Sequence, residues 1–301
     1  MIDVFICTYN PEEIFLKRTV DGILSQTLDK SKWTITIIDN NSKFPVADFE
    51  FLKSLNIKVI VESKQGLTAA RGCAVKNASA EILVFVDDDN ILEKDYLKCV
   101  QDAFNDEQIA ILSGAIYPEY LKEPQQWFYV FEEMLAIRKI KGNELIINKK
   151  SVFNGLFPIG AGMAVRKNVM EEYYNDHLKE ENYIEGRKGN DLSSGEDLDL
   201  DFYALNRGYK IGVNPLMQLT HIIPANRITF KYIKKLTSSS MRSSCLLNKK
   251  WSKVFGHNVY EIFDMTKSQL LIRLIWNRFS GFINKQKYIR YLVLKTILTV
   301  K

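Results

Sequence analysis

Glu81-Ile82-Leu83-Val84-Phe85-Val86 runs directly into Asp87-Asp88-Asp89-Asn90. The apolar run has the length and composition of a strand, and it predicts a buried parallel strand. The acids then fall at its carboxyl end, where open α/β sheets bind their ligands. Two carboxylates about 4 Å apart repel by roughly 4 kcal/mol at an effective dielectric of about 20, so the cluster stays hydrated or gathers a cation. Oxygen ligands suit Mg²⁺ or Mn²⁺, and the alternative is a solvated acidic turn that caps the next helix.

Strands and helices alternate over the first half of the chain. We expect strands near 2–7, 33–38, 57–62, 81–86 and 109–113, and helices near 12–27, 46–55, 67–79 and 93–105. This alternation predicts an α/β fold with a parallel sheet and helices on its faces. Further on we expect a strand within 158–166, an acid-led helix from 196 to a glycine cap at 208, and two short strands at 209–213 and 218–222.

Polar, turn-forming residues follow each of the early strands, as a shared ligand crevice would require. The clusters are Thr8-Tyr9-Asn10-Pro11, Asp39-Asn40-Asn41-Ser42 and Glu62-Ser63-Lys64-Gln65-Gly66. Tyr9 is suited to stacking on a base, Asp39 to accepting a hydrogen bond from a base or ribose, and Arg71 to an anionic group. Ordinary turn and surface roles are the commoner explanation for each of these residues when it is taken singly.

The charge of the chain is divided unevenly. Its 301 residues, 46% of them hydrophobic, carry a net charge of +5, yet residues 228–301 alone carry +13 and residues 1–227 carry −8. Basic residues in 228–301 interleave with aliphatic and aromatic ones, which predicts amphipathic helices that lie on an anionic membrane or pack onto the body or a partner subunit. No nucleic-acid-binding motif accompanies the charge, so we expect no nucleic-acid partner.

Location follows from the same observations. The chain opens on a core-like strand, no apolar run reaches the roughly 18 residues of a spanning helix, and four scattered cysteines form no framework. We therefore expect a cytoplasmic protein, peripheral on the inner face of the membrane if the basic segment binds lipid.

Taken together, these stretches make the chain resemble the family-2 glycosyltransferases, which have the GT-A fold. The resemblance spans roughly 1–227 and rests on the order of several motifs. They are Cys7-Thr8-Tyr9-Asn10-Pro11, Ile38-Asp39-Asn40-Asn41-Ser42, Gln65-Gly66 through Arg71, Asp87-Asp88-Asp89, Gly195-Glu196-Asp197, and His221 with Pro224 and Arg227. It implies a GT-A domain over 1–227, built on a Rossmann-like mixed, mostly parallel sheet with helices on both faces. The nucleotide-binding half is expected at 1–115 and the acceptor and catalytic half at 116–227, followed by a basic amphipathic helical segment at 228–301.

The resemblance also implies roles for particular residues. A nucleotide-sugar donor, by expectation a UDP-sugar, would be held by Thr8, Tyr9, Asn10, Asp39, Arg71, Asp87, Asp88 and Arg227. Asp89 and His221 would ligate Mn²⁺ or Mg²⁺ at the diphosphate. Asp197 is the expected general base, with Glu196 the alternative. Trp127 and Gly162 are weaker candidates for contact with the acceptor.

The acceptor would be a glycan, a lipid-linked glycan or another cell-surface polymer, and a homo-oligomer stays open. A sugar nucleotidyltransferase would need a glycine-rich basic loop after the first strand, which this chain lacks. A haloacid-dehalogenase-type phosphatase would need a hydroxyl residue where Asn90-Ile91 stands. The remaining alternative is a catalytically silent glycan-binding or scaffold protein on the same fold.

Overall fold

The computed structural model describes residues 1–150, 155–177, 184, 186, 187, 192, 194–281 and 284–300. The chain forms two compact units, and neither is a single stretch of sequence. The first unit consists of Met1–Glu119, Ala136–Tyr183 and Leu200–Ile222, and the second of Tyr120–Leu135, Ile184–Asp199 and Ile223–Lys301.

Apart from the last residue in two cases, the strands lie in the first unit. They are β1 (Ile2–Thr8), β2 (Trp33–Asp39), β3 (Lys58–Val61), β4 (Ile82–Val86), β5 (Asn90–Leu92), β6 (Ile109–Tyr120), β7 (Ile146–Asn148), β8 (Met163–Arg166) and β9 (Lys210–Ile223). Within the described residues these nine strands form one sheet in the order β3-β2-β1-β4-β8-β6-β9-β5, with β7 paired to β9.

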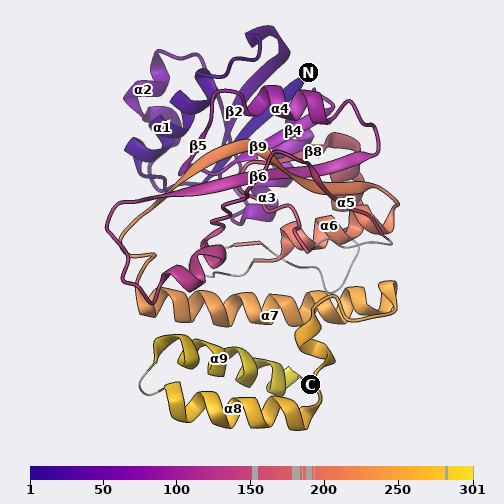
Figure 1. The fold of residues 1–301 in the computed structure, drawn as a ribbon. Coiled ribbons are helices and arrows are strands. Elements are labelled where there is room, and N and C mark those ends of the chain that lie inside the picture. The colour runs from indigo at the N-terminus through magenta and orange to yellow at the C-terminus, as the bar shows by residue number, and fades with distance from the viewer. Residues whose placement is uncertain are drawn as a thin grey trace. The chain divides into compact units, whose positions relative to one another are not determined.

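The direction of the strands confirms the predicted α/β architecture. The pairs β3–β2, β2–β1 and β1–β4 are parallel. Strand β8 runs antiparallel to both β4 and β6, so β6 points the same way as the first four strands. The strands β5 and β7 add antiparallel pairs to β9. The result is a mixed sheet whose parallel part holds the sequence-predicted strands, with helices on either side of it (Figure 1).

The α-helices are α1 (Glu13–Leu24), α2 (Glu50–Lys53), α3 (Leu67–Asn77), α4 (Tyr96–Ala103), α5 (Lys167–His177), α6 (Glu196–Asn206), α7 (Phe230–Phe255), α8 (Lys267–Gly281) and α9 (Lys285–Val300). Short 3-10 helices occur at η1 (Lys30–Lys32), η2 (Val46–Asp48), η3 (Tyr129–Leu135) and η4 (Glu261–Asp264). The predicted helix over 46–55 is therefore two short pieces, because Phe49 lies between them in an extended conformation.

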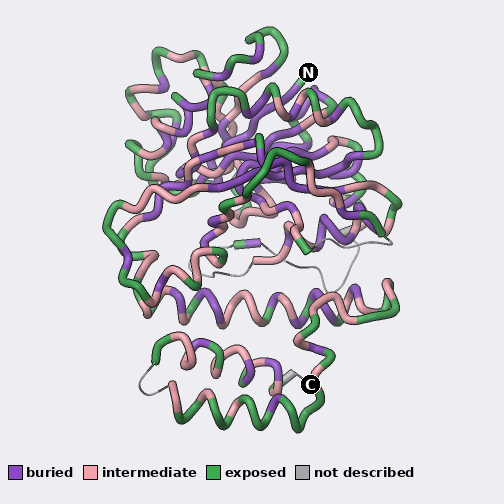
Figure 2. Tube along the Cα trace, viewed as in Figure 1, coloured by how far each residue is buried: buried purple, intermediate pink, exposed green. Residues whose placement is uncertain are grey.

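The core of the first unit lies on the central strands, which are buried almost throughout (Figure 2). Phe5 and Phe85 face each other across the β1–β4 pair and stack with ring centroids 6.1 Å apart. Helix α1 approaches β5 closely at Gly22, where an added Cβ would lie 2.9 Å from Ile91 and 3.2 Å from the backbone nitrogen of Leu92. Burial on both faces explains why β4 reads as an unbroken apolar run.

Asp3 ties together the edge of the sheet away from the acidic triplet. Its carboxylate accepts hydrogen bonds from Thr34 Oγ1 at 2.6 Å and from the backbone nitrogens of Ser79 and Ala80 at 2.6 and 2.8 Å. Burial raises the pKa of Asp3, but these hydrogen bonds outweigh it, so the pKa lies below its usual value. The charged form is therefore part of the folded structure.

One sequence prediction about the strands is wrong. The two short strands expected at 209–213 and 218–222 are a single continuous strand, β9. Pro215, which lacks a backbone donor, does not end the strand, because side chains supply local partners beside it. Asn214 Oδ1 accepts from the Leu216 nitrogen at 3.0 Å, and Gln218 Nε2 donates to the Pro215 carbonyl at 3.3 Å.

Helices make up most of the second unit, as the basic amphipathic pattern of 228–301 predicts. Thr229 caps the N-terminus of α7, where its hydroxyl accepts from the Tyr232 nitrogen, and Gly256 caps the C-terminus in the left-handed region with φ of 78°. Helices α8 and α9 pack against each other, and α9 also packs on α7. Over the described part of the chain, every helix is too short or too polar to cross a membrane.

Candidate functional site

The strand ends that carry polar residues come together at one edge of the sheet. The register pairs Thr8 with Asp39 on β1 and β2, and Ile6 with Val86 on β1 and β4. The acidic triplet therefore begins beside the loops that follow the first two strands. A hydrogen bond from Thr8 Oγ1 to Asp88 Oδ2 joins the first loop to the triplet.

Asn40 connects the loops that follow β1, β2 and β3, and sequence reasoning did not single it out. Its Nδ2 donates to the carbonyls of Glu62 at 3.2 Å and Lys64 at 2.8 Å, and its Oδ1 accepts from the Gly66 nitrogen at 2.7 Å. Its own backbone nitrogen donates to the Thr8 carbonyl at 2.8 Å. The available signal was a small amide placed directly after a buried strand, a position that favours turn formation.

Asp39 and Asn10 also make hydrogen bonds to the loop that follows β2. Asp39 accepts from the backbone nitrogens of Ser42 at 2.9 Å and Val46 at 3.0 Å. Asn10, with φ of 52°, accepts from the Lys43 nitrogen at 2.8 Å, and its own nitrogen donates to Ser42 Oγ. Both predicted donor-binding residues therefore have a structural task, and direct contact with a donor stays a prediction for each.

Tyr9 and Arg71 differ sharply in exposure. The Tyr9 side chain is 42% exposed at the end of β1, as a ring that stacks on a ligand would need to be. Arg71 is buried on α3, with its guanidinium carbon 5.6 Å from the centroid of the Phe85 ring.

Burial raises the pKa of the neighbouring Cys7 thiol to about 12, so Cys7 is no nucleophile at neutral pH.

Asp89 and His221, the predicted metal ligands, lie side by side in the first unit. Strand β5 begins at Asn90, which pairs with His221 on β9, and the Ile222 nitrogen donates to the Asp89 carbonyl at 2.9 Å. This pairing brings His221 Nε2 to 3.5 Å from Asp89 Oδ1, and both side chains are buried. The pairing of β5 with β9 thus brings together Asp89 and His221, which are 132 positions apart in the sequence.

Asp89 and His221 have the donor atoms and the spacing that would supply two ligands to a divalent cation. Adjacent ligands of an octahedral cation with bonds of about 2.1 Å lie roughly 3 Å apart, close to the separation seen here. Asn90 Nδ2 donates to Asp89 Oδ1 at 3.0 Å, and Asn90 Oδ1 is buried with no hydrogen-bond partner among the described residues. The described residues contain no group of three His, Cys, Asp or Glu side chains that would hold a metal alone.

The predicted base and its neighbour lie in the second unit, in the first turn of α6. Glu196 is buried and Asp197 half-buried. Gly195, with φ of +133°, precedes the helix, and a Cβ there would lie 3.2 Å from side-chain atoms of Ser243 and Leu247 on α7. The glycine is therefore required by backbone conformation and by the close approach of α7.

Asp199 anchors this first turn and was missed by sequence reasoning. It is fully buried and accepts from Trp251 Nε1 at 2.7 Å and Lys250 Nζ at 3.1 Å, both on α7. A buried carboxylate that lost these donors would carry a large desolvation penalty. Asp199 thus fixes the turn that carries Asp197, and no local sequence signal links it to residues about 50 positions away.

The weaker candidates have packing roles. Trp127 in the second unit packs edge-on against Phe230 at 5.5 Å, and Lys285 Nζ lies 4.8 Å from its ring centroid. Gly162 in the first unit has φ of +70°, and a Cβ there would lie 2.5 Å from Tyr96 Oη. Arg227 is half-buried in the second unit. The fold accounts for Trp127 and Gly162 without an acceptor, so their contact with one stays a prediction.

Comparison with known proteins points to one family. The sequence model described as Glycosyl transferase family 2 matches residues 3–174. The chain is 26% identical over 161 residues to the glycosyltransferase GlyA of Streptococcus pneumoniae serotype 4, covering 52% of this chain and 21% of GlyA. It is 30% identical over 122 residues to the minor teichoic acid biosynthesis protein GgaA of Bacillus subtilis strain 168, covering 37% of this chain and 27% of GgaA.

The fold is also found in a solved structure. The crystal structure of S. aureus TarS 1–349 in complex with UDP-GlcNAc matches 99% of this chain and 90% of that chain, with a TM-score of 0.54 and 15% sequence identity. At that identity the match supports the fold and nothing finer. The chain spans only about a fifth of GlyA and about a quarter of GgaA.

Proposed function

The chain belongs to glycosyl transferase family 2, and from this premise we propose that it transfers a sugar from a nucleotide-sugar donor, a UDP-sugar, to a hydroxyl group of an acceptor. The acceptor is a glycan, a lipid-linked glycan or another cell-surface polymer. The transfer inverts the configuration at the anomeric carbon and needs no covalent sugar intermediate.

The convergence of the strand-end loops carries this proposal. Thr8, Asp39 and the acidic triplet lie at the carboxyl ends of neighbouring strands, and Thr8 Oγ1 donates to Asp88. The Asn40 side chain joins the loop after β2 to the loop after β3. Ligands of open α/β sheets bind at such an edge. The exposed ring of Tyr9 is suited to stacking on the base, and Asp39, Asp87 and Asp88 to contacts with the nucleoside and sugar. TarS, a protein of similar fold, has been crystallised with UDP-GlcNAc, which supports a UDP-sugar as donor.

Asp89 and His221 would hold Mn²⁺ or Mg²⁺ beside the diphosphate of the donor. When bound, the ion would neutralise charge on the departing nucleoside diphosphate. Their separation of 3.5 Å supports this assignment, as does Asn90 Oδ1 next to them, which is buried and has no hydrogen-bond partner in the described part of the chain. Arg71 and Arg227 would complement the remaining negative charge of the donor.

Asp197 would act as the general base. Its carboxylate takes the proton of the acceptor hydroxyl as that oxygen forms a bond to the anomeric carbon, and the bond between that carbon and the diphosphate oxygen breaks, with its electrons leaving on the nucleoside diphosphate. Glu196 would orient the acceptor. The anchor at Asp199 supports the choice of this turn, because a base must be held within hydrogen-bond reach of the proton it removes.

The finer assignments follow from the relatives and from charge. UDP-GlcNAc in TarS and the teichoic acid role in the name of GgaA favour an N-acetylhexosaminyl or hexosyl transfer onto a cell-surface polymer. We place the protein in the cytoplasm, peripheral on the inner face of the membrane, because residues 228–301 carry +13.

Two variants test the chemistry separately. We expect Asp89→Ala to abolish Mn²⁺-dependent UDP binding, measured by isothermal titration with and without EDTA. Asp197→Asn should bind UDP as the wild type does and lose release of UDP from a UDP-sugar in the presence of acceptor. Asp102→Ala is the matched control, because Asp102 is an exposed acid on α4.

Loss of UDP binding in Asp197→Asn would argue against Asp197 as the base. If no UDP-sugar supports turnover with any acceptor tested, and UDP with Mn²⁺ does not raise the melting temperature, the catalytically silent glycan-binding or scaffold protein becomes the better description.

A further inference from the structure

Helix α8 in the second unit carries a row of large apolar side chains on its surface. At about 100° per residue, the members of the row fall within an arc of about 140°. The row consists of Leu271 (48% exposed), Ile272 (69%), Ile275 (56%), Trp276 (69%) and Phe279 (70%). We call these five residues the α8 apolar row. Isolated exposed apolar residues are ordinary, but a contiguous row marks a surface that is covered by something else.

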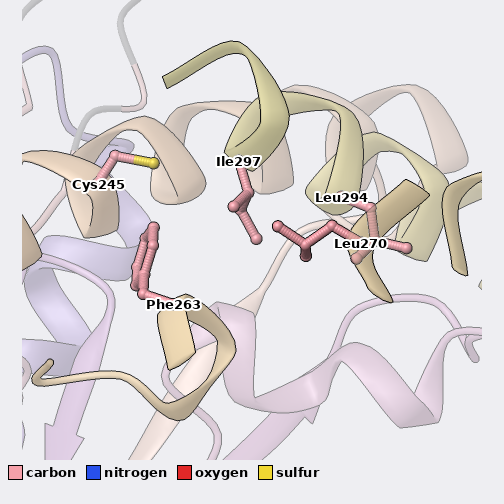
Figure 3. Close-up of a cluster of buried hydrophobic side chains, with 5 residues drawn as sticks. All are labelled: Cys245, Phe263, Leu270, Leu294 and Ile297. Atoms are coloured by element: carbon pink, nitrogen blue, oxygen red, sulfur yellow. The ribbon is translucent and has the colours of Figure 1, made fainter. Parts of the chain in front are cut away.

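The opposite face of α8 already supplies the hydrophobic core of the helical hairpin. Leu270 is fully buried and belongs to a hydrophobic cluster that also contains Leu294 and Ile297 of α9, Phe263 of η4 and Cys245 of α7 (Figure 3). Helix α8 therefore has two apolar faces, and the inner one fixes the helix in place. The inner face of α8 is already packed in the core, so the exposed α8 apolar row is a second, separate apolar surface.

The charge around the row favours one kind of occupant. Residues 265–301 contain eight Lys or Arg and no Asp or Glu. Arg273 and Arg278 are exposed and flank the row on the helical wheel, and Lys287 Nζ lies 5.8 Å from the centroid of the Trp276 ring. A second copy of this face would bring the basic residues Arg273, Arg278 and Lys287 of both copies together, and residues 265–301 hold no acid to pair them. An anionic leaflet attracts each of these charges instead.

We propose that the α8 apolar row docks on an anionic lipid surface, with the helix lying in the plane of the interface. The aliphatic members and Phe279 enter the boundary between headgroups and acyl chains, Trp276 sits at headgroup level, and Arg273 and Arg278 meet lipid phosphates. This assignment deepens the membrane location in the proposed function and rests on it for its biological meaning. Lipid binding is measured without the nucleotide-sugar donor, so the lipid-docking proposal and the proposed sugar transfer can fail separately.

Vesicle flotation of the full chain tests the proposal. We expect binding to vesicles of phosphatidylcholine mixed with phosphatidylglycerol, little binding to phosphatidylcholine alone, and weakening with added salt. Ile272→Asp should lower the partition coefficient about tenfold or more, since burying one such side chain is worth a factor of that order. Arg273→Glu combined with Arg278→Glu halves the charge of residues 265–301 and should clearly weaken the preference for anionic lipid.

Ile14→Asp is the matched control, because Ile14 on α1 is 64% exposed and the substitution is chemically identical. The proposal is overturned if Ile14→Asp and Ile272→Asp reduce binding equally, or if binding ignores lipid charge. It is also overturned if the chain does not bind vesicles but forms a concentration-dependent dimer that Ile272→Asp dissociates in analytical ultracentrifugation. Titration with UDP in the same preparations separates each of these results from a failure of the donor site.

Discussion

Replacing Asn40 by alanine tests how the loops of the proposed nucleotide site are held. The substitution removes two hydrogen bonds that the side-chain amide donates, to the carbonyls of Glu62 and Lys64, and one that it accepts from the Gly66 nitrogen. Asn40 is 5% exposed, so water does not readily replace them. At about 1 kcal/mol net for each bond, we expect a loss of about 2–3 kcal/mol of unfolding free energy.

Thermal unfolding and UDP titration measure the effect. The melting temperature should fall by roughly 4–10 °C, and UDP should bind roughly tenfold more weakly because ordering the loops then opposes binding. The control is Asn77→Ala, since Asn77 is exposed and, among the described residues, its amide donates only to Cys73 within its own helix. Unchanged stability and UDP affinity in Asn40→Ala, or equal effects in both variants, would refute the account of Asn40 as the link between the loops.

Three further substitutions test other contacts. Asp3→Asn should cost about 1.5–3 kcal/mol at neutral pH. Burial raises the pKa of Asp3, but its hydrogen bonds together lower it more, so the folded-state pKa lies below the unfolded-state pKa of about 3.9. The contribution of Asp3 to the unfolding free energy is therefore complete above the unfolded-state pKa and is lost as the pH falls through the folded-state pKa. The gap between variant and wild type in urea unfolding should therefore close in acid, and a gap independent of pH would contradict this. Gly162→Ala should destabilise by about 1–3 kcal/mol more than Gly142→Ala, because both glycines have positive φ but only Gly162 lacks room for a Cβ; equal melting temperatures would show that the crowding is relieved at no cost. Trp251→Phe should lower the unfolding free energy by about 1.5–3 kcal/mol by removing the indole donor from the buried Asp199, and an unchanged denaturation midpoint would exclude that anchor.

The parallel part of the fold was predictable because each element carried its own local signal. The apolar run before Asp87 has the length of a strand and is buried on both faces, and such a run cannot be a surface element. The end of α6 was equally predictable from sequence. Gly208 adopts φ of +90°, and its nitrogen donates a hydrogen bond to the Leu205 carbonyl. The residues next to these boundaries determine where β4 and α6 end, so both ends could be predicted from the sequence alone.

The contacts that bridge distant segments were not predictable in the same way. Asp89 and His221 were paired through a family resemblance, and their proximity depends on β5 pairing with β9. Asp199 looks in sequence like one more acid at a helix start. Its burial under Trp251 is a property of the packing of α7, and nothing within a few residues of it records that packing.

The exposed face of α8 shows a third kind of limit. The sequence indicates that the basic segment is amphipathic, but several apolar positions compete for the interior. Only packing shows that Leu270 is taken into the core while Ile272 and Trp276 remain outside. The amphipathic pattern predicted helices in this segment, and the choice of inner face came from the neighbouring helix α9.

The central claim is that a metal-held nucleoside diphosphate binds where β1, β2 and β4 end. A crystal structure of this chain with UDP and Mn²⁺, with an anomalous difference map, tests it most directly. We predict a manganese peak coordinated by Asp89 and His221, with the uracil ring beside Tyr9 and the ribose near Asp39. UDP bound elsewhere on the molecule, or manganese absent from Asp89 while UDP is present, would contradict the claim.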